Sequence, residues 1–414
     1  MAKELHVVML PWSGFGHLMP FFQLSIALAK AKIHVSYIST PKNIQRLPKV
    51  SPDLQPFIHL VPIPFPPLEP DFLPQGAETG VDVPFEKLDN LQIAYDLLQT
   101  PIKQFIADQM PDWIVPDIAA HWVVDIAKEY GVPLVYFSVS SAATSAFCGP
   151  PENLSGANRN YALPLPQSLT SPPEWITFPS LVAFKEYEAT YVPRVLFGPN
   201  STGISGASRV AKIISASQLC FVGFGSECKL SKEQVHEIAY GLELSELPFL
   251  WALRKPISAN NVDEVDDFLP LGFVDRTSEK GLVCFGWVPQ MEILGHPSVG
   301  GSLFHSGWGS VIETLQFGHC LVVLPFINDQ PLNARLLVEK GLAIEVKRNK
   351  DGSFSRDEIA KTLRRAMVEE EGGQLRTNAR KAAVVFRDHK LHQDHYIGAF
   401  VDYLKNNGAK RSSS

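Results

Sequence analysis

Short apolar runs of strand length alternate with segments of helical periodicity along most of this 414-residue chain. In the first half, residues 5–10 and 34–38 are such runs, and residues 20–32 between them carry apolar side chains at helical spacing. A loop rich in Gly and Pro, residues 11–17, joins the first run to the helical segment. Alternation of this kind predicts parallel strands whose sheet is covered by helices on both faces.

The same alternation recurs further along the chain. It predicts strands at 113–115, 132–139, 221–224, 249–253, 282–285, 301–304 and 321–324, and helices at 122–128, 231–244, 310–317, 331–340, 356–370 and 382–404, the last as one long helix or a pair. Ser231 and Gln234 form a capping box at the start of their helix. Residues 60–85 and 148–204 are predicted to be long surface loops, which often line substrate pockets.

The length suggests two or three domains, and each half opens with a strand and a Gly-containing loop. The sequence therefore predicts an α/β chain of two similar domains, residues 1–220 and 221–385. Residues 386–414 are expected to form a C-terminal helix that packs back on the first domain and then a frayed tail. Ligands in such sheets bind at the carboxyl ends of the strands, so a substrate cleft is expected between the domains.

Composition and charge exclude several classes of protein. Apolar residues make up 45% of the chain and charged residues 19%, which is a globular composition. A net charge of -6 disfavours a nucleic-acid partner. There is no apolar stretch of about 18 residues and no signal-like start, so we expect no membrane segment and a cytoplasmic location. Five cysteines without a CxxC pair fit a reducing compartment, and we expect a monomer.

The segment of residues 287–330 reads WVPQMEILGHPSVGGSLFHSGWGSVIETLQFGHCLVVLPFINDQ. It resembles, without a gap, the donor-binding signature of plant family-1 UDP-sugar glycosyltransferases. The runs PWSGFGHLMP at 11–20, GSE at 225–227 and PLNARLL at 331–337 agree with that family. The resemblance implies the GT-B fold, with two Rossmann-like domains facing across a cleft. The first domain would bind the acceptor and the second the UDP-sugar.

The residues around His305 also suggest how a diphosphate would bind. A buried strand, residues 300–304, runs through a glycine-bearing turn into a helix, and the N-terminus of such a helix presents free amide groups to an anion. The His305 side chain, the Ser310 hydroxyl and the loop at Ser226 could add donors, and such donors stabilise a departing UDP. The chain contains no D-x-D pair, so we expect UDP to leave without help from a metal.

Glu313 has two interpretations. With Ser310 it matches a capping box, which needs no ligand. The resemblance instead assigns its carboxylate to the ribose hydroxyls. It also implies a uracil-stacking Trp287 and donor contacts from Val288, Gln290, Trp308, Gly309, Asp329 and Gln330. A signature that ends in Gln favours UDP-glucose, although users of UDP-xylose and UDP-rhamnose also carry it.

His17 follows the first predicted strand, and the resemblance places it at the family's catalytic base. Histidine, with an ordinary pKa of about 6.5, suits removal of a proton from a hydroxyl acceptor. A carboxylate on its other ring nitrogen would fix the tautomer. Asp117, at the end of the strand at 113–115, matches the family's partner position, and Asp112 and Asp125 are the local competitors. The expected reaction is a single displacement with inversion.

Two further sequence features restrict the range of possible functions. Residues 14–19 hold two glycines but Met19 where a dinucleotide fingerprint needs a third, so a dinucleotide oxidoreductase is rejected. Gly309 replaces the family's usual Asn, as in the branch-forming subgroup of plant secondary metabolism. That subgroup adds a sugar to a sugar already carried by a flavonoid, terpenoid or steroid. The Phe- and Pro-rich loops of the first half fit an apolar acceptor body.

The chain departs from the family at the domain junction. Residues 217–221 run directly into residues 222–226, where the family has several tens of additional residues. Ile33 also stands at a tight turn where the family has Gly. A competing hypothesis follows from this shortage. It describes a non-catalytic relative that binds a UDP-sugar or a glycoside without turnover.

Overall fold

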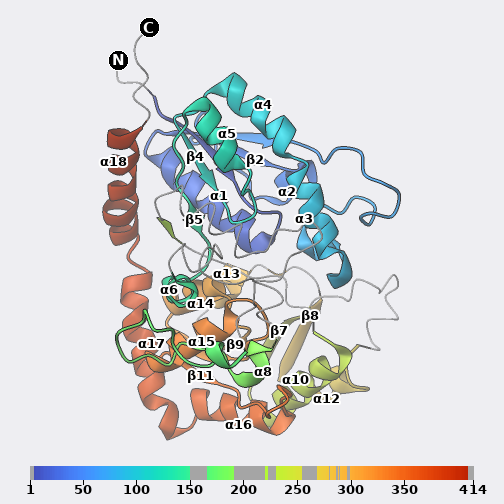
Figure 1. The fold of residues 1–414 in the computed structure, drawn as a ribbon. Coiled ribbons are helices and arrows are strands. Elements are labelled where there is room, and N and C mark those ends of the chain that lie inside the picture. Colours follow the sequence, from blue (N-terminus) through green and yellow to red (C-terminus); the bar gives the residue numbers. More distant parts are fainter. Residues whose placement is uncertain are drawn as a thin grey trace. The chain divides into compact units, whose positions relative to one another are not determined.

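The computed structural model describes residues 4–149, 166–190, 220–221, 230–253, 268–278, 280–285, 288, 290–295 and 299–408. The chain divides into two compact units (Figure 1). The first unit comprises Met1–Leu165, Tyr191–Glu227 and Asp388–Ser414. The second unit comprises Pro166–Thr190 and Cys228–Arg387. None of the described helices is both long and apolar enough to cross a membrane.

The first unit is built on a parallel sheet in the order β3-β2-β1-β4. Its strands are β1 (His6–Leu10), β2 (His34–Ser39), β3 (Ile58–Pro62) and β4 (Trp113–Pro116). The prediction of parallel strands is confirmed here, because β1 pairs in parallel with both β2 and β4. β3 was not predicted, and the loop expected at 60–85 is wrong for residues 60–62, which belong to this strand.

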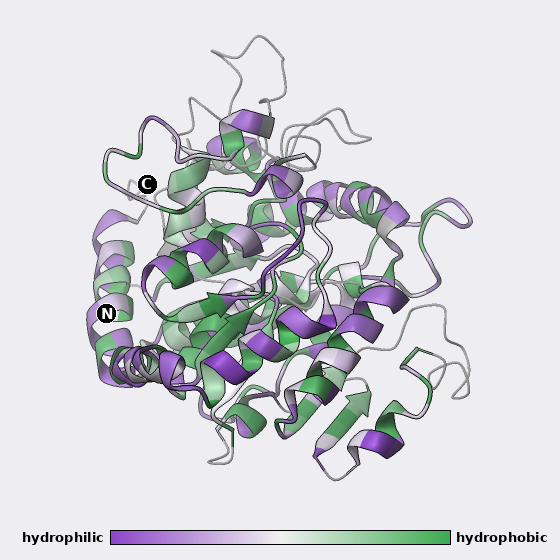
Figure 2. Cartoon of the chain, turned by 90° about the horizontal axis from the view of Figure 1, so that it is seen from below, coloured by the Kyte–Doolittle hydropathy of each residue, from purple (hydrophilic) through white to green (hydrophobic). Residues whose placement is uncertain are grey.

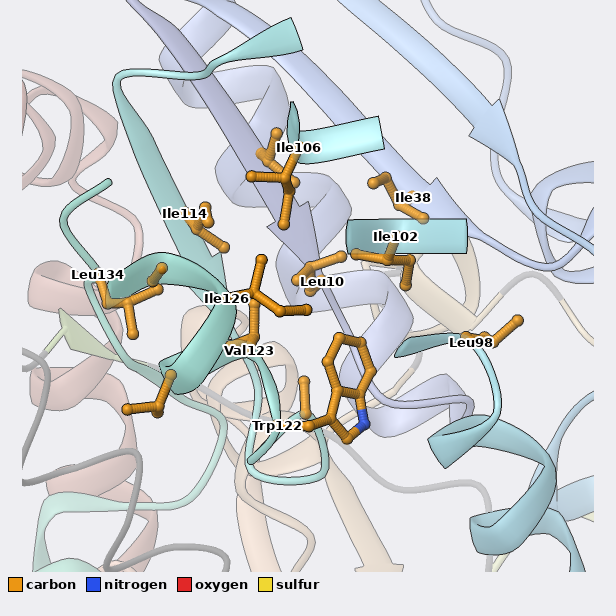
Figure 3. Close-up of a cluster of buried hydrophobic side chains, with 14 of the residues drawn as sticks. Leu10, Ile38, Leu98, Ile102, Ile106, Ile114, Trp122, Val123, Ile126 and Leu134 are labelled. Carbon is orange, nitrogen blue, oxygen red and sulfur yellow. The ribbon is translucent and has the colours of Figure 1, made fainter. Parts of the chain in front are cut away.

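Helices cover both faces of this sheet, as the alternation predicts. Alternate side chains of β1 point to opposite faces, so Val8 and Leu10 meet one set of helices while Val7 and Met9 meet another. Figure 3 shows the first set, in which Ile102 and Ile106 of α4 (Gln99–Gln109) and Ile126 of α5 (Val123–Tyr130) surround Leu10. This core fixes the carboxyl edge of the sheet, where β1 and β4 end together.

The opposite face packs on α1 (Phe15–Lys30) and on the C-terminal helix α18 (Gly398–Asn407). Leu404 of α18 is fully buried, and its carbonyl accepts a hydrogen bond of 3.0 Å from the Trp113 indole. The C-terminal segment therefore contributes to the core of the first unit. In the turn before β2, the residue with left-handed backbone is Lys32 (φ 61°). The next position therefore does not require glycine, and Ile33 at that position is buried in the core.

Two predicted strands are shorter than expected. The strand predicted at 132–139 is reduced to β5 (Phe137–Ser138), with a single bridge between Leu134 and Ile114 before it. The strand predicted at 221–224 is described only as β6 (Cys220–Phe221), which pairs in parallel with β5. This pairing puts β6 in the first unit, although residue 221 was expected to open the second domain.

The second unit contains two parallel ladders. One has the order β11-β10-β9, formed by β9 (Gly301–Phe304), β10 (Cys320–Val323) and β11 (Ala343–Glu345). The other pairs β7 (Phe249–Leu253) with β8 (Gly281–Phe285). Within the described residues no ladder joins β7 to β9. The side chains of β9 are only partly buried, whereas those of β10 are fully buried.

Helices cover the three-stranded ladder of the second unit on both faces. Ile238 of α10 (Lys232–Ser245) and Ile359 of α16 (Arg356–Met367) share one core cluster with Val322 of β10. α14 (Trp308–Gln316) and α15 (Gln330–Glu339) share the other cluster with Leu321 and Val323. The capping box predicted at the start of α10 is confirmed.

Residues 166–190 belong to the second unit, although the sequence placed them with the first domain. They carry α8 (Glu186–Ala189), whose Glu188 is fully buried against Arg335 of α15. The ion pair between Glu188 and Arg335 explains why residues 166–190 pack with the second unit, since a buried carboxylate needs its cation nearby.

The other described elements of the first unit are α2 (Pro41–Arg46), η1 (Gly80–Asp82), η2 (Phe85–Lys87), α3 (Leu88–Asp96), α6 (Ala142–Cys148) and the π-helix η6 (Leu391–Ile397). Those of the second unit are η3 (Pro166–Leu169), α12 (Phe273–Thr277), α13 (Gln290–Leu294), η5 (Glu370–Gly372) and α17 (Gly373–Phe386). Figure 2 shows green, apolar strands and helices that alternate between purple and green, the pattern of helices with one buried face.

Candidate active site

His17 and Asp117 come from neighbouring strands of the first unit. β1 and β4 are paired in parallel up to Leu10 and Pro116, so the segments that follow them leave the sheet at the same edge. The loop after β1 leads into α1, and His17 lies in the first turn of that helix. Asp117 directly follows β4, and its backbone amide donates a 3.0 Å hydrogen bond to the Leu10 carbonyl.

The Asp117 carboxylate is buried and held by three donors. Its Oδ2 accepts hydrogen bonds from the backbone amide of Trp12 at 2.8 Å and from Nδ1 of His17 at 2.7 Å. Its Oδ1 accepts from the amide of Ile118 at 2.6 Å. The exposed fraction is 1% for the Asp117 side chain and 21% for the His17 side chain. The carboxylate is therefore fixed in place, while the imidazole is reachable from outside.

This geometry selects one tautomer of His17. Because carboxylate oxygens only accept, Nδ1 must carry the proton that it donates to Asp117. The lone pair of the neutral ring then lies on Nε2. The pair has the arrangement of a general base with an orienting carboxylate, which also stabilises the imidazolium once the proton is taken.

The two competing acids lie elsewhere. Asp112 precedes β4, at the opposite end of that strand, and its Oδ2 accepts a 3.0 Å hydrogen bond from the amide of His6. Asp125 is exposed on α5. Of the three candidate acids, the structure thus brings Asp117 to His17.

An apolar cluster adjoins this pair. The amide of Trp12 is bonded to Asp117, and its ring packs edge-on against Tyr95 with 5.0 Å between ring centroids. The Trp12 ring also borders a cluster with the partly buried side chains of Phe65, Leu73 and Leu88. The base is therefore next to apolar surface from the loop after β3 and from α3.

In the second unit, β9 ends in the turn His305-Ser306-Gly307, and α14 begins at Trp308. The N-cap of α14 is Gly307, so Ser310 lies inside the first turn and the predicted capping box of Ser310 with Glu313 is wrong. A Cβ at Gly307 would lie 2.6 Å from Nε2 of His305, so the absence of a side chain at this position lets the His305 ring lie close to the turn. This turn places the amide groups of the helix N-terminus next to the His305 ring.

A hydrogen-bond network joins this turn to the start of α15. Ser306 has a left-handed backbone (φ 61°), and its hydroxyl donates to the carbonyl of Gln330 at 2.9 Å. Asn333 donates to the Ser306 carbonyl at 3.2 Å and to Oδ2 of Asp329 at 2.9 Å. Ser306, next to the His305 that the sequence assigns to the phosphates, is thus joined in one network to Asp329 and Gln330, which it assigns to the sugar.

Glu313 lies one turn further along α14 and meets Gln290 of α13. Nε2 of Gln290 donates to Oε2 of Glu313 at 2.5 Å. Burial raises the pKa of the Glu313 carboxyl to about 7, and the hydrogen bond from Gln290 offsets part of that effect. Among the residues that the structure describes, no cation pairs with this partly buried carboxylate, so the site would gain from hydroxyl donors of a ligand.

The remaining predicted donor residues are distributed as follows. Trp308 is partly buried at the start of α14, Gly309 is buried beside it, and Val288 is half-buried. Asp329 is half-buried, whereas Gln330 is buried with its Oε1 accepting from the amides of Phe326 and Ile327, each at 3.0 Å. Ser226 and Trp287 lie outside the described residues.

Three contributors were not singled out from the sequence, namely Trp12, Ser306 and Asn333. Trp12 acts through its backbone amide, which no side-chain pattern reveals. Asn333 lies four residues after Asp329, one helical turn away, and that spacing is a usable signal. Ser306 could not be found, because its role depends on a left-handed backbone.

A comparison with protein-family models matches residues 213–395 to the family described as "UDP-glucoronosyl and UDP-glucosyl transferase". Among curated proteins, the chain is 37% identical to the soyasaponin III rhamnosyltransferase of Glycine max, with 97% of this chain and 96% of that protein covered. It is 35% identical to the UDP-glycosyltransferase 91D2 of Stevia rebaudiana, with 98% of this chain and 96% of that protein covered.

Solved structures show the same fold. The crystal structure of Glycyrrhiza uralensis UGT73P12, complexed with glycyrrhetinic acid 3-O-monoglucuronide, superposes with a TM-score of 0.73 at 21% identity and covers 98% of this chain and 96% of that one. The expected α/β GT-B fold is therefore confirmed. The chain belongs to the UDP-dependent glycosyltransferases of plant family 1, and it is related to the 91 group of that family.

Proposed function

We propose that this enzyme transfers a sugar from a UDP-sugar to a hydroxyl of a small-molecule glycoside, with His17 as the base and with inversion at the anomeric carbon. The observation that carries the proposal is the 2.7 Å hydrogen bond from Nδ1 of His17 to the buried Asp117 carboxylate. It leaves the Nε2 lone pair to take a proton, on a ring that is partly exposed.

The proton and the electron pairs move in one displacement. Nε2 of His17 takes the proton of the acceptor hydroxyl while that oxygen forms a bond to the anomeric carbon. The bond from the anomeric carbon to the β-phosphate oxygen breaks, and UDP leaves with the electron pair. An α-linked donor then yields a β-glycoside. Asp117 stabilises the imidazolium, because its carboxylate accepts the hydrogen bond from Nδ1 of His17.

The donor would be held by residues of the second unit. The amide groups at the N-terminus of α14, with the His305 and Ser310 side chains, supply donors for the diphosphate. Glu313 would accept hydrogen bonds from the ribose hydroxyls, as a carboxylate with no described cation partner and a raised pKa is suited to do. Asp329 and Gln330 would contact the sugar, and Trp287 would stack on the uracil.

UDP-glucose is the proposed donor, on the basis of the Gln330 position. A relative at 37% identity is named a rhamnosyltransferase, so UDP-rhamnose is the alternative to be assayed beside it. The two donors present different hydroxyl patterns to Asp329 and Gln330, and comparison of kcat/KM for the two decides between them.

The proposed acceptor is a glycoside of a terpenoid or flavonoid, extended at its sugar. Relatives named soyasaponin III rhamnosyltransferase and mogroside IIIx synthase support this class. The apolar cluster around Trp12, Phe65 and Leu88, next to Asp117, gives an aglycone a surface to pack on.

A non-catalytic relative that only binds UDP-sugar or glycoside is the second candidate. The alignment with the Glycine max relative spans 467 positions, 53 more than the 414 residues of this chain. In addition, the described ladders β7-β8 and β9-β10-β11 of the second unit are not joined. A chain that keeps its phosphate turn but is shorter than its relatives could retain UDP and fail in turnover.

One pair of assays separates the candidates. The enzyme is mixed with UDP-glucose or UDP-rhamnose and a terpenoid or flavonoid glycoside, and glycosylated product is measured by mass spectrometry. We expect product from the native chain and a loss of roughly 10²–10⁴-fold in kcat for His17→Ala, with an unchanged Kd for UDP. UDP binding without product in the native chain would support the second candidate, and full activity of His17→Ala would exclude His17 as the base.

A further inference from the structure

Two arginines bracket the turn that carries Asp329 and Gln330. This turn, residues 325–330, connects β10 to α15. Before it, Arg348 donates a hydrogen bond from Nη2 to the carbonyl of Pro325. After it, Arg335 donates from Nη1 to the carbonyl of Pro331 at 3.2 Å. The backbone of the turn is therefore held at both ends by cationic side chains.

Both arginines are in turn held by adjacent residues of α8. Glu188 accepts two hydrogen bonds from Nη2 of Arg335, at 2.8 and 2.7 Å, and their side chains are only 2% and 10% exposed. The ring of Tyr187 lies 6.0 Å from the Arg348 guanidinium carbon. That guanidinium also lies over Phe326, at 4.7 Å, so one face of the turn is part of the same cluster.

The side chains of this cluster also bond to one another. The Tyr187 hydroxyl donates to Oε1 of Glu188 at 3.1 Å. Arg335 also pairs with Glu345 at 3.0 Å, and Glu345 pairs with Lys185 at 2.7 Å. Arg335 and Lys185 thus balance Glu188 and Glu345, which is the condition under which buried charges are tolerated, while Arg348 lies over aromatic rings. α8 belongs to the segment of residues 166–190, which is separated from α15 by more than a hundred residues of chain.

We propose that α8 is a positioning element for the donor sugar, in which Tyr187 and Glu188 fix the turn of residues 325–330 through Arg348 and Arg335. The inference rests on the proposed function, in which Asp329 and Gln330 contact the sugar. Tyr187, Glu188, Arg335 and Arg348 are positioning residues, since each acts on the turn and not on the substrate. A displacement of about 1 Å at such a turn is enough to impair sugar recognition.

Recognition of the sugar and recognition of UDP would then depend on different turns of the second unit. The phosphates and ribose are expected at the other turn of the unit, between β9 and α14. Loosening of α8 should therefore weaken binding of UDP-glucose relative to UDP. It should also reduce discrimination between UDP-glucose and UDP-galactose, which differ only in the orientation of one hydroxyl.

The test compares Glu188→Gln with the native chain by calorimetry, with UDP and UDP-glucose as separate ligands and no acceptor present. We expect the Kd for UDP-glucose to rise about tenfold while the Kd for UDP stays within about twofold. Steady-state assays should show a raised KM for UDP-glucose and a smaller ratio of kcat/KM between UDP-glucose and UDP-galactose. A purely structural role would reduce the folded, active fraction and leave both KM and the ratio unchanged, and that result overturns the proposal.

Glu237→Gln is the matched control. It breaks another arginine pair of the same unit, in which Arg356 is bonded to Glu237 and stacked 4.1 Å over Tyr240. We expect it to change neither the Kd for UDP-glucose nor the selectivity. If Glu237→Gln had the same effect as Glu188→Gln, the loss of any ion pair in this unit would be enough to weaken UDP-glucose binding. That result would refute a special role of α8.

Tyr187→Phe serves if Glu188→Gln does not fold. This variant keeps the ring over Arg348 and removes only the hydrogen bond to Glu188, and it should shift the Kd for UDP-glucose in the same direction by a smaller factor. Unchanged sugar recognition in every folded variant overturns the proposal. Because the calorimetry needs no turnover, a native chain without transferase activity would refute the proposed function while the binding result still decided the role of α8.

Discussion

At the scale of single residues, Asp117 combines structural and chemical roles. Its carboxylate binds the amides of Trp12 and Ile118 as well as the ring of His17. We predict that Asp117→Asn lowers kcat by roughly 10²–10⁴-fold, because an amide group can present its N–H₂ to Nδ1 and so favour the wrong tautomer. The measurement is kcat with saturating donor and acceptor, beside the Kd for UDP, which should not change.

Asp112→Asn is the control for that change. Asp112 lies at the other end of β4 and accepts from the amide of His6, so its replacement should leave kcat near the native value. Native kcat in Asp117→Asn would contradict the assigned role of the carboxylate.

Glu313 gives a prediction about pH. Burial raises its pKa to about 7, so in the free enzyme the carboxyl gains a proton as the pH falls below that value. Only the ionised form accepts hydrogen bonds from two ribose hydroxyls, so binding of UDP must release this proton. The Kd for UDP should therefore rise by up to about tenfold per pH unit below pH 7 and level off above it. Calorimetry between pH 5.5 and 8.5 measures this dependence.

Stability has the opposite pH dependence. The folded-state pKa of Glu313 lies above its ordinary value, so the native state holds the proton more tightly than the unfolded chain does, and the free energy of unfolding falls as the pH rises from about 4.5 to 7. Glu313→Gln should remove both pH dependences and bind UDP weakly throughout. A slope that persists in Glu313→Gln would assign the titration to another group.

At the scale of elements, the turn between β9 and α14 depends on Gly307. A Cβ at this position would meet the His305 ring at 2.6 Å, so the ring must move. We predict that Gly307→Ala raises the Kd for UDP about tenfold, because His305 and the amides of the helix N-terminus no longer converge. Gly300→Ala is the matched control, since nothing lies within 4 Å of a Cβ there, and it should bind UDP normally. Equal affinities in the two variants would refute this role of the turn.

Some helices and strands were predicted more accurately than others, and the difference depends on how clearly the local sequence marks their ends. Runs such as β1, β9 and β10 are apolar and bounded by turn residues, so their type and position follow from local sequence. β5 was overestimated, since its run of apolar residues packs in the core without a full ladder. The position of the N-cap at Gly307 depended on tertiary contacts, and the local capping signal at Ser310 was misleading.

At the scale of the whole molecule, the C-terminal segment returns to the first unit, and Leu404 of α18 is fully buried there. We predict that Leu404→Ala destabilises the first unit by about 2–5 kcal/mol, through lost apolar contact and a cavity. Denaturant unfolding with and without UDP measures this, because a ligand stabilises only the unit that binds it. The transition that UDP shifts should keep its midpoint in this variant.

Leu271→Ala is the control at this scale, because that side chain is 96% exposed and its removal should leave both transitions in place. A Leu404→Ala variant that lowers the UDP-dependent transition instead would show that the two units do not unfold separately.

The sequence by itself determined the order and type of most elements, the α/β class and the family, because periodicity and motif spacing are local properties of the chain. It also named His17 and Asp117, since the resemblance to the family carries a base and its partner to these two positions. Only the tertiary structure decided where residues 166–190 and 220–221 belong, and that two arginines hold the turn before α15. These outcomes rest on pairings such as Glu188 with Arg335, where burial and charge balance select partners far apart in the chain, and no local pattern records that choice.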